Sequence, residues 1–250
     1  MGELRRVRLL GLDFDDVAPA EAAAMIASRD ARAPFRYVVT PNADHFVRLA
    51  RQPALLPLYR DAALCLMDSR VVARAAVALS LAVPRVIPGS DLTERLLRDH
   101  LAPGERITIL GLRAAHLPAL IARCGLASPA HYDPPMGFEH DPVQVRRCVD
   151  FVVAHPARLV FLAVGSPRQE RLAAAIAATG QAVGTGLCIG ASLDFLAGVQ
   201  HRAPRWTQRA GLEWLHRLAS DPRRFARRYL LDNPPVFALL VRERLARPRG

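Results

Sequence analysis

The stretch of sequence that decides the fold is residues 158–178, RLVFLAVGSPRQERLAAAIAA. Its apolar first part predicts a buried β-strand at residues 158–164, and the Gly-Ser-Pro that follows predicts a tight turn. The alanine- and leucine-rich remainder has apolar residues at three- and four-residue spacing, which predicts a helix at residues 167–178. A buried strand that leads through a turn into a helix is the repeating unit of an α/β sheet.

The same alternation of strand and helix extends over most of the chain. Further strands are expected at residues 7–11, 36–40, 63–67, 106–111 and 181–184. Further helices are expected at residues 20–28, 43–51, 70–80, 91–100, 114–123 and 142–154. Strands that alternate with helices of this length predict a mainly parallel sheet with helices on both faces.

The amino-acid composition changes after Gly198. We expect an α/β core at residues 1–198 and a basic, amphipathic helical appendage at residues 199–250. Appendage helices are expected to begin near residue 202 and at Asp221-Pro222, because a capping residue followed by proline is typical of a helix start. Residues 201–250 contain 12 arginines and four acidic residues, so they carry +8 of the net charge of +11. A basic end on a nearly neutral body predicts a polyanionic partner: anionic lipid, phosphate or nucleic acid.

The composition excludes several classes of protein. An apolar content of 51% is ample for a packed core, which excludes a disordered chain. The four cysteines lack metal-ligand spacing, which argues against a zinc site or a disulfide framework and fits a reducing cytoplasm. There is no signal-peptide pattern, and no apolar run approaches the roughly 20 residues of a spanning helix. We therefore expect a protein that is soluble or attached to a membrane surface. A homo-oligomer is left open.

Candidate site residues follow the expected strands. In parallel α/β sheets, ligands bind at the carboxyl ends of the strands. Polar, glycine and proline residues cluster at residues 40–42, 68–70, 111–112, 165–170 and 184–186. Glycine lets the backbone approach a ligand, and free amides at a helix start bind phosphate oxygens. The candidates for substrate binding include Gly111, Gly165, Pro167, Gln169 and Gly186. The alternative is that these are ordinary turn and cap residues.

Seven segments carry a resemblance to a known family. They are VTPNAD (residues 39–44), LMD (66–68), VIPGSDL (86–92), GSPRQE (165–170), SLDFLAG (192–198), RAPRW (202–206) and GLEWLHR (211–217). On these residues the chain resembles the WecG/TagA/CpsF glycosyltransferase family, which adds the second sugar to lipid-linked precursors of cell-surface polysaccharides. The resemblance implies a Rossmann-like α/β fold and an inverting transfer that needs no metal or other cofactor.

The resemblance also implies roles for residues at the strand ends. Asp68 matches the proposed catalytic base, which would deprotonate the acceptor hydroxyl. Thr40 and Asn42 match positions near the donor sugar and join Asp68 as catalytic candidates. Gln169 and Asp194 match positions that line the nucleotide pocket, where Asp194 is suited to accept the ribose hydroxyl protons.

The appendage arginines Arg217, Arg224 and Arg227 match residues that the family brings over the active site. Their guanidinium groups suit the departing diphosphate. The expected partners are a UDP-sugar, a polyprenyl-diphosphate-linked sugar and an anionic membrane surface. The expected location is the cytoplasm, with peripheral attachment to the inner face of the cytoplasmic membrane. The chain departs from most relatives at Ser69, where they have glycine. Asp68-Ser69 together with PPMGF at residues 134–138 looks like the exopolysaccharide branch of the xanthan type, in which glucose is a candidate for the transferred sugar.

Two other functions would each explain one feature of the sequence. A nucleic-acid-binding protein would explain the basic end, but no recognition motif or aromatic stacking platform accompanies it, so nucleic acid is not an expected partner. A Rossmann oxidoreductase would explain the glycines at residues 184–190, but their spacing is GxGxxxG. Asp13 and Asp15 resemble a metal-binding DxD pair, and we interpret them as helix caps. His45 and His216 are interpreted as surface or satisfied core histidines, with a substrate contact as the alternative. Asp91 is interpreted as either a helix cap or a substrate contact.

Overall fold

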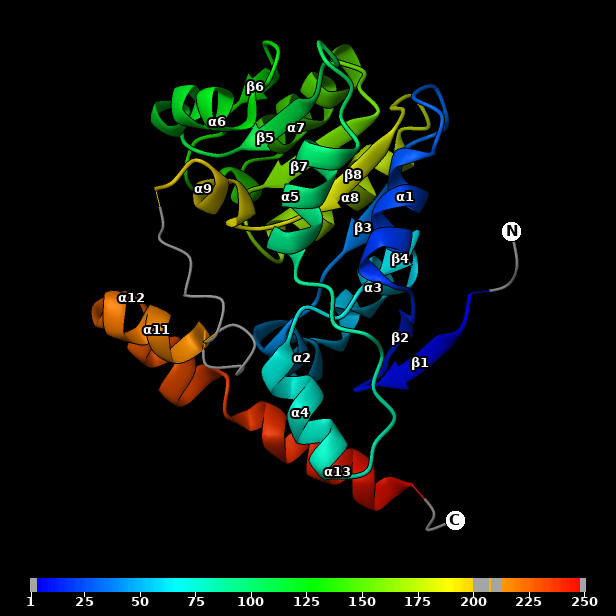
Figure 1. The fold of residues 1–250 in the computed structure, drawn as a ribbon, viewed down its shortest axis with the longest axis vertical. Helices are drawn as coiled ribbons and strands as arrows, with labels where there is room; N and C mark the ends of the chain where they lie inside the picture. Colours follow the sequence, from blue (N-terminus) through cyan, green and yellow to red (C-terminus); the bar gives the residue numbers. More distant parts are fainter. Residues whose placement is uncertain (1–3, 200–206, 208–212, 248–250) are drawn as a thin grey trace.

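The computed structural model describes residues 4–199, 207 and 213–247. Its centre is a six-stranded, fully parallel sheet with the strand order β4-β3-β8-β7-β5-β6 (Figure 1). The strands are β3 (Arg36–Val39), β4 (Leu64–Cys65), β5 (Thr108–Gly111), β6 (Ala130–Tyr132), β7 (Leu159–Ala163) and β8 (Thr185–Cys188). The prediction of a parallel α/β sheet is therefore confirmed.

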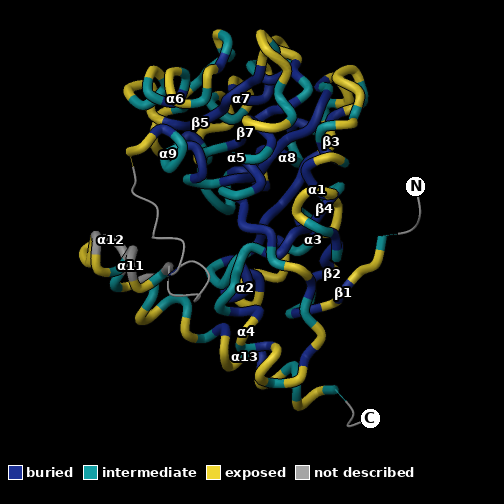
Figure 2. Tube along the Cα trace, in the orientation of Figure 1, coloured by how far each residue is buried: buried dark blue, intermediate teal, exposed yellow. Residues whose placement is uncertain are grey.

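Helices cover both faces of the sheet, as predicted. On one face α7 (Pro142–Ala154) and α8 (Arg168–Ala178) pack against alternate strand residues such as Val160 and Leu162 of β7. On the other face Leu159 and Phe161 of the same strand meet α1 (Pro19–Ala27), α5 (Gly89–Asp99), α6 (Leu117–Cys124) and α9 (Ser192–Leu196). The strand is buried on both sides, which explains why its sequence is continuously apolar (Figure 2).

Two of the expected strands are corrected by the structure. Residues 7–11 do not form one strand but part of an antiparallel hairpin of β1 (Arg6–Leu9) and β2 (Leu12–Asp15). Leu10 and Gly11 turn the chain with φ values of 50° and 80°, a left-handed pair that matches the twist of a two-residue hairpin. The expected strand at residues 181–184 lies instead at residues 185–188, and β6 was not predicted at all.

Glycine packing explains the error at β8. A side chain on Gly184 would place its Cβ 2.0 Å from the carbonyl oxygen of Ala157, and one on Gly186 would place it 2.4 Å from the ring of Phe35. These glycines therefore mark close packing inside the fold and not a ligand loop. Gly186 lies inside β8, away from its carboxyl end, so the predicted position of Gly186 in a strand-end loop is wrong.

The remaining elements gather at one end of the molecule (Figure 1). They include α2 (Ala43–Arg51), α3 (Leu56–Arg60), α4 (Arg70–Ala78), α11 (Glu213–Ser220), α12 (Pro222–Arg227), a π-helical turn (Arg228–Asp232) and α13 (Pro235–Ala246). Short 3-10 turns lie at Pro53–Leu55, Ala114–His116 and Phe138–His140.

The helix expected to begin near residue 202 falls outside the described residues. No helix in the part of the chain that the structure describes is long and apolar enough to cross a membrane.

The last helix packs onto the body. Val236 and Leu240 of α13 are fully buried in the main core, where α13 meets α2 and α4. Glu243 accepts a hydrogen bond from the backbone amide of Leu10 at 2.6 Å, which ties α13 to the hairpin. The division of the chain at residue 198 stays a prediction, but α13 shares its core with residues on the other side of that boundary.

Candidate active site

Three chain segments lie side by side at the carboxyl edge of the sheet. The backbone amide of Asp68 donates to the carbonyl oxygen of Pro41 at 3.0 Å, and the amide of Ile87 donates to that of Met67 at 2.8 Å. The first bond continues the pairing of β3 with β4 beyond the last ladder residues, and the second places the segment before α5 beside the segment after β4, where Met67 and Val86 form a parallel bridge. The loop at residues 40–42, the loop at 68–70 and the start of α5 therefore meet, as the strand-end rule predicts.

Thr40 lies directly beneath the start of α5. Its hydroxyl donates to the carbonyl oxygen of Cys188 at 3.3 Å, and only 8% of the residue is exposed. A side chain on Gly89 would place its Cβ 2.9 Å from the Thr40 hydroxyl oxygen. Glycine at position 89 thus lets the first turn of α5 close over Thr40, which links β3, β8 and α5 at one point.

Asp68 is half-buried and immediately precedes the N-cap of α4. The cap is Ser69, whose hydroxyl oxygen accepts a hydrogen bond from the Val72 amide at 3.2 Å. Its φ of −156° is extended backbone that any residue adopts, so the serine here needs no glycine-like geometry. Next to it, Arg70 forms an ion pair with Asp91 at 3.3 Å, which joins the starts of α4 and α5.

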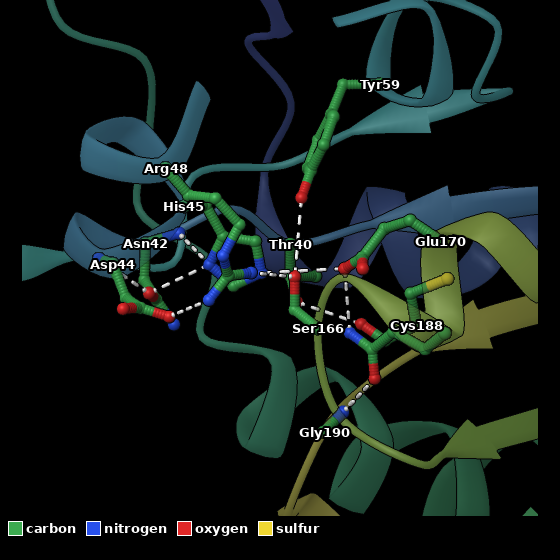
Figure 3. A network of polar contacts seen from close by, with 11 residues as sticks. Thr40, Asn42, Asp44, His45, Arg48, Tyr59, Ser166, Glu170, Cys188 and Gly190 are labelled. Atoms are coloured by element: carbon green, nitrogen blue, oxygen red, sulfur yellow. Dashed lines mark hydrogen bonds and ion pairs between the residues drawn. The ribbon is translucent and has the colours of Figure 1, made fainter. Parts of the chain in front are cut away.

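Asn42 caps α2 and belongs to a buried polar network (Figure 3). Its side-chain oxygen Oδ1 accepts from the Asp44 amide at 3.2 Å and lies 2.9 Å from Nδ1 of His45. The other ring nitrogen of His45 lies 3.5 Å from Oε1 of Glu170. The start of α2 is therefore connected to the start of α8.

Gln169 connects the same network to the loop after β8. Its Oε1 accepts from the Gly190 amide at 2.8 Å and its Nε2 donates to Glu170 at 2.9 Å. Burial by itself raises the pKa of Glu170, but hydrogen bonds from His45 and Gln169 and the charge of His45 bring that pKa below its ordinary value. Gln169 is only 3% exposed, so its amide supports the loop from within the protein.

Gly165 and Pro167 lie in the turn between β7 and α8. Gly165 has a φ of 78°, which favours glycine, and the Ser166–Pro167 peptide bond is cis. The Ser166 hydroxyl accepts from the Arg48 guanidinium at 2.7 Å, which holds this turn against α2. The turn is thus joined to the Asn42 loop, as the strand-end rule predicts.

Gly111 and Asp194 lie farther along the same edge. A side chain on Gly111 would place its Cβ 2.7 Å from the carbonyl carbon of Ala163, so glycine permits the close approach of β5 and β7. Asp194 in α9 lies 3.0 Å from Nδ1 of His116, which follows β5. Both partners are partly exposed, so this carboxylate remains accessible from solvent.

Comparison with known proteins identifies the family of the chain. A family model described as the glycosyl transferase WecG/TagA/CpsF family matches residues 7–250. The chain belongs to this family. It is 26% identical over 240 residues to the N-acetylglucosaminyldiphosphoundecaprenol N-acetyl-beta-D-mannosaminyltransferase of Staphylococcus aureus strain MW2, covering 93% of this chain and 90% of the relative. The corresponding protein of strain MRSA252 is 25% identical over 238 residues.

The protein is thus a glycosyltransferase, which agrees with the sequence resemblance. Neither a nucleic-acid-binding protein nor an oxidoreductase matches this family membership. The glycines at positions 184 and 186, which suggested a dinucleotide loop, pack against Ala157 and Phe35 instead.

The DxD pair of this glycosyltransferase belongs to the hairpin. The carboxylate of Asp15 accepts from the Cys65 amide at 2.9 Å and from Arg6 at 3.1 Å, and the residue is 3% exposed. Asp13 forms an ion pair with Arg8 at 3.8 Å across the two strands. The interpretation of both as helix caps is wrong, because β2 ends at Asp15 and α1 is capped by Ala18.

The appendage arginines are only partly placed relative to this edge. Arg227 ends α12, with its Nε 3.8 Å from Oδ2 of Asp232. Arg217 lies in α11 and Arg224 in α12, and their side chains are outside the described part of the structure. The convergence of these arginines with Asp68 stays a prediction.

Two partners of the predicted site residues give no signal of their own in the sequence. Glu170 lies in the GSPRQE motif and contacts His45, and His116 contacts Asp194. Spacing along the chain gave no signal, because Glu170 lies 125 positions from His45 and His116 lies 78 positions from Asp194.

Proposed function

We propose that this glycosyltransferase moves a hexose or N-acetylhexosamine from a UDP-sugar to a polyprenyl-diphosphate-linked sugar, with inversion and without a metal. The observation that carries the proposal is the hydrogen bond that holds Asp68 beside the Thr40–Asn42 loop at the carboxyl edge of the sheet. The names of the S. aureus relatives support a lipid-linked sugar acceptor, because those enzymes act on N-acetylglucosaminyldiphosphoundecaprenol.

Direct displacement at the anomeric carbon needs a general base for the acceptor hydroxyl. Asp68 is the proposed base: its half-buried carboxylate takes the hydroxyl proton as the acceptor oxygen attacks. The bond to the leaving UDP oxygen breaks on the opposite face of the sugar, so the anomeric configuration inverts. Thr40 and Asn42, on the neighbouring loop, are proposed to orient the donor sugar.

The nucleotide is proposed to lie along the edge toward α9. There the partly exposed carboxylate of Asp194 is suited to accept hydrogen bonds from the ribose hydroxyls. The backbone between the ribose and the reacting sugar is proposed to be that of the loops at Gly111, Gly165 and Pro167. Arg217, Arg224 and Arg227 are proposed to neutralise the departing diphosphate through bidentate contacts, in place of a metal ion.

Attachment to the inner face of the cytoplasmic membrane completes the proposal. On α13 the outer face carries Phe237, Val241 and Leu245, which are 45%, 44% and 79% exposed and lie four residues apart. Arg242, which is exposed on the same helix, follows Val241 of this strip directly. Apolar side chains bordered by cations suit an anionic bilayer, in which the lipid tail of the acceptor lies.

The proposal is tested by supplying the purified full chain with a synthetic N-acetylglucosaminyl-diphosphopolyprenol and a panel of UDP-sugars. We expect one UDP-sugar to yield UDP and a glycolipid that is one sugar longer, at an unchanged rate in EDTA. The linkage in the product, determined by NMR, is expected to have the opposite anomeric configuration to the donor. Failure with every UDP-sugar, retention of configuration, or loss of turnover in EDTA would each contradict the corresponding part of the proposal.

A further inference from the structure

His45 is a buried histidine that the proposed chemistry does not use. It is 6% exposed, at the start of α2 beneath the carboxyl edge of the sheet. Its ring lies edge-on to the ring of Tyr59, with centroids 6.0 Å apart. Figure 3 shows its imidazole between the side chains of Asn42 and Glu170. Both ring nitrogens therefore face polar partners on different elements.

The orientation of the Asn42 carboxamide follows from its neighbours. The Asp44 amide donates to the Asn42 side chain at 3.2 Å, so the atom that receives it is the oxygen Oδ1. Nδ1 of His45 lies 2.9 Å from the same oxygen and 3.3 Å from the backbone nitrogen of Asn42, so the imidazole contacts both the side chain and the backbone of this residue. Because Oδ1 faces the Asp44 amide, the Asn42 amide nitrogen is left to donate elsewhere.

Glu170 supplies the charge on the other side of the ring. The carboxylate is 1% exposed, and its Oε1 accepts from Gln169 at 2.9 Å and faces Nε2 of His45 at 3.5 Å. Hydrogen-bond donors offset the cost of burying a carboxylate. Arg48, the nearby cation of α2, pairs with Asp44 and Ser166. The geometry therefore places the His45 ring between Asn42 and Glu170, in contact with both.

We propose that His45 is a positioning residue of the transfer reaction: it holds the Asn42 side chain so that its amide nitrogen faces the donor sugar. The inference rests on the proposed role of Asn42 in sugar binding. Glu170 acts as the anchor, because it is itself held by Gln169, which also binds the Gly190 amide. The start of α2, the start of α8 and the loop after β8 thus set the position of one carboxamide.

A double-mutant cycle between His45 and Asn42 tests the proposal. His45→Phe retains an aromatic ring against Tyr59 and removes both hydrogen bonds. We expect His45→Phe and Asn42→Ala each to lower kcat about tenfold or more, with a smaller effect on UDP affinity. The double variant is expected to have the kcat of Asn42→Ala alone, because His45 acts through Asn42. Losses that multiply, or a normal kcat in His45→Phe, would overturn the inference.

Further variants separate positioning from folding. His45→Gln keeps an N–H donor and is expected to recover part of the kcat lost in His45→Phe, a rescue that loss of packing alone does not predict. Glu170→Gln keeps the shape and removes the charge, and it repeats the cycle with Asn42→Ala if His45→Phe does not fold. The control is His140→Phe, whose side chain is 85% exposed, and its kcat should not change.

The outcome also distinguishes this inference from the proposed function. A normal kcat in Asn42→Ala would refute the proposed role of Asn42 and with it the basis of the inference. An impaired Asn42→Ala with independent losses at His45 would leave the proposed function standing and refute only the positioning role. All values of kcat are measured per folded molecule, with the folded fraction taken from near-ultraviolet circular dichroism.

Discussion

Asp68 and Pro41 are joined through their backbones, with the Asp68 nitrogen 3.0 Å from the Pro41 oxygen. This bond carries the pairing of β4 with β3 past the end of the regular ladder and brings residue 68 to the loop that contains Thr40 and Asn42. Because this bond uses no side-chain atoms, it can still form when the carboxylate is replaced.

Replacing the Asp68 carboxylate should separate chemistry from binding. In Asp68→Asn we expect turnover to fall by about two orders of magnitude or more, because an amide cannot take up the proton of the acceptor hydroxyl. Affinity for UDP, measured by isothermal titration calorimetry, should stay close to that of the wild type. The matched control is Asp150→Asn, an exposed aspartate that pairs with Arg146. Wild-type turnover in Asp68→Asn would refute the assignment of the base.

Ser69 should be a helix cap and not an obstacle to catalysis. Replacing it with alanine removes the hydroxyl that caps α4 and should cost about 1 kcal/mol of unfolding free energy, whereas glycine should cost only a few tenths. Because φ at this position is −156°, glycine offers no conformational advantage. Urea denaturation and turnover of both variants test this. A large gain of activity in Ser69→Gly would mean that the serine distorts the site.

Gly186 should be required by the ring of Phe35. In Gly186→Ala the new methyl group would lie 2.4 Å from that ring, so we expect a loss of about 1–3 kcal/mol of unfolding free energy. In the double variant Phe35→Ala, Gly186→Ala the two losses should be less than additive, because removal of the ring vacates the space. Urea denaturation of the four proteins provides the cycle. Strictly additive losses would show that the clash is not the cause.

The two faces of α13 should respond differently to substitution. Leu240→Ala removes a fully buried side chain and should cost about 2–5 kcal/mol of unfolding free energy. Leu245→Ser changes a side chain that is 79% exposed and should alter stability by less than about 0.5 kcal/mol. It should nevertheless weaken co-sedimentation with anionic vesicles. Undiminished vesicle binding in Leu245→Ser would argue against membrane docking through this face.

Glu105 should contribute a pH-dependent part of the stability, on a contact remote from Asp68. Arg158 binds both its carboxylate oxygens, at 2.7 and 2.8 Å, and its hydrogen bonds lower the pKa of Glu105 below the ordinary value. The folded pKa is thus below the unfolded one, so the stabilisation is complete above the unfolded pKa and is lost as the pH falls through the folded pKa. Urea denaturation between about pH 6 and 3 should show that the free energy of unfolding depends less on pH in Glu105→Gln than in the wild type. An unchanged dependence would mean that other carboxylates account for it.

The sequence by itself predicted the parallel α/β architecture, and it selected the loops of the candidate site. The period of the apolar residues predicted the sheet and most of its helices, because short-range periodicity reflects which side of an element is buried. The strand-end rule then selected residues 40–42, 68–70 and 165–170, which the tertiary structure brings together. The resemblance to the family rests on motifs such as GSPRQE, and the match of the family model over residues 7–250 confirms it.

Only the tertiary structure decided what individual residues in those patterns are for. Glycine at position 165 allows a left-handed turn, whereas glycine at position 186 allows close packing. The packing at position 186 is decided by Phe35, which is distant in sequence. Likewise His45 is an ordinary helical residue until Glu170 faces its ring. Such contacts join side chains across the fold, so neither the spacing of residues nor the composition encodes them locally.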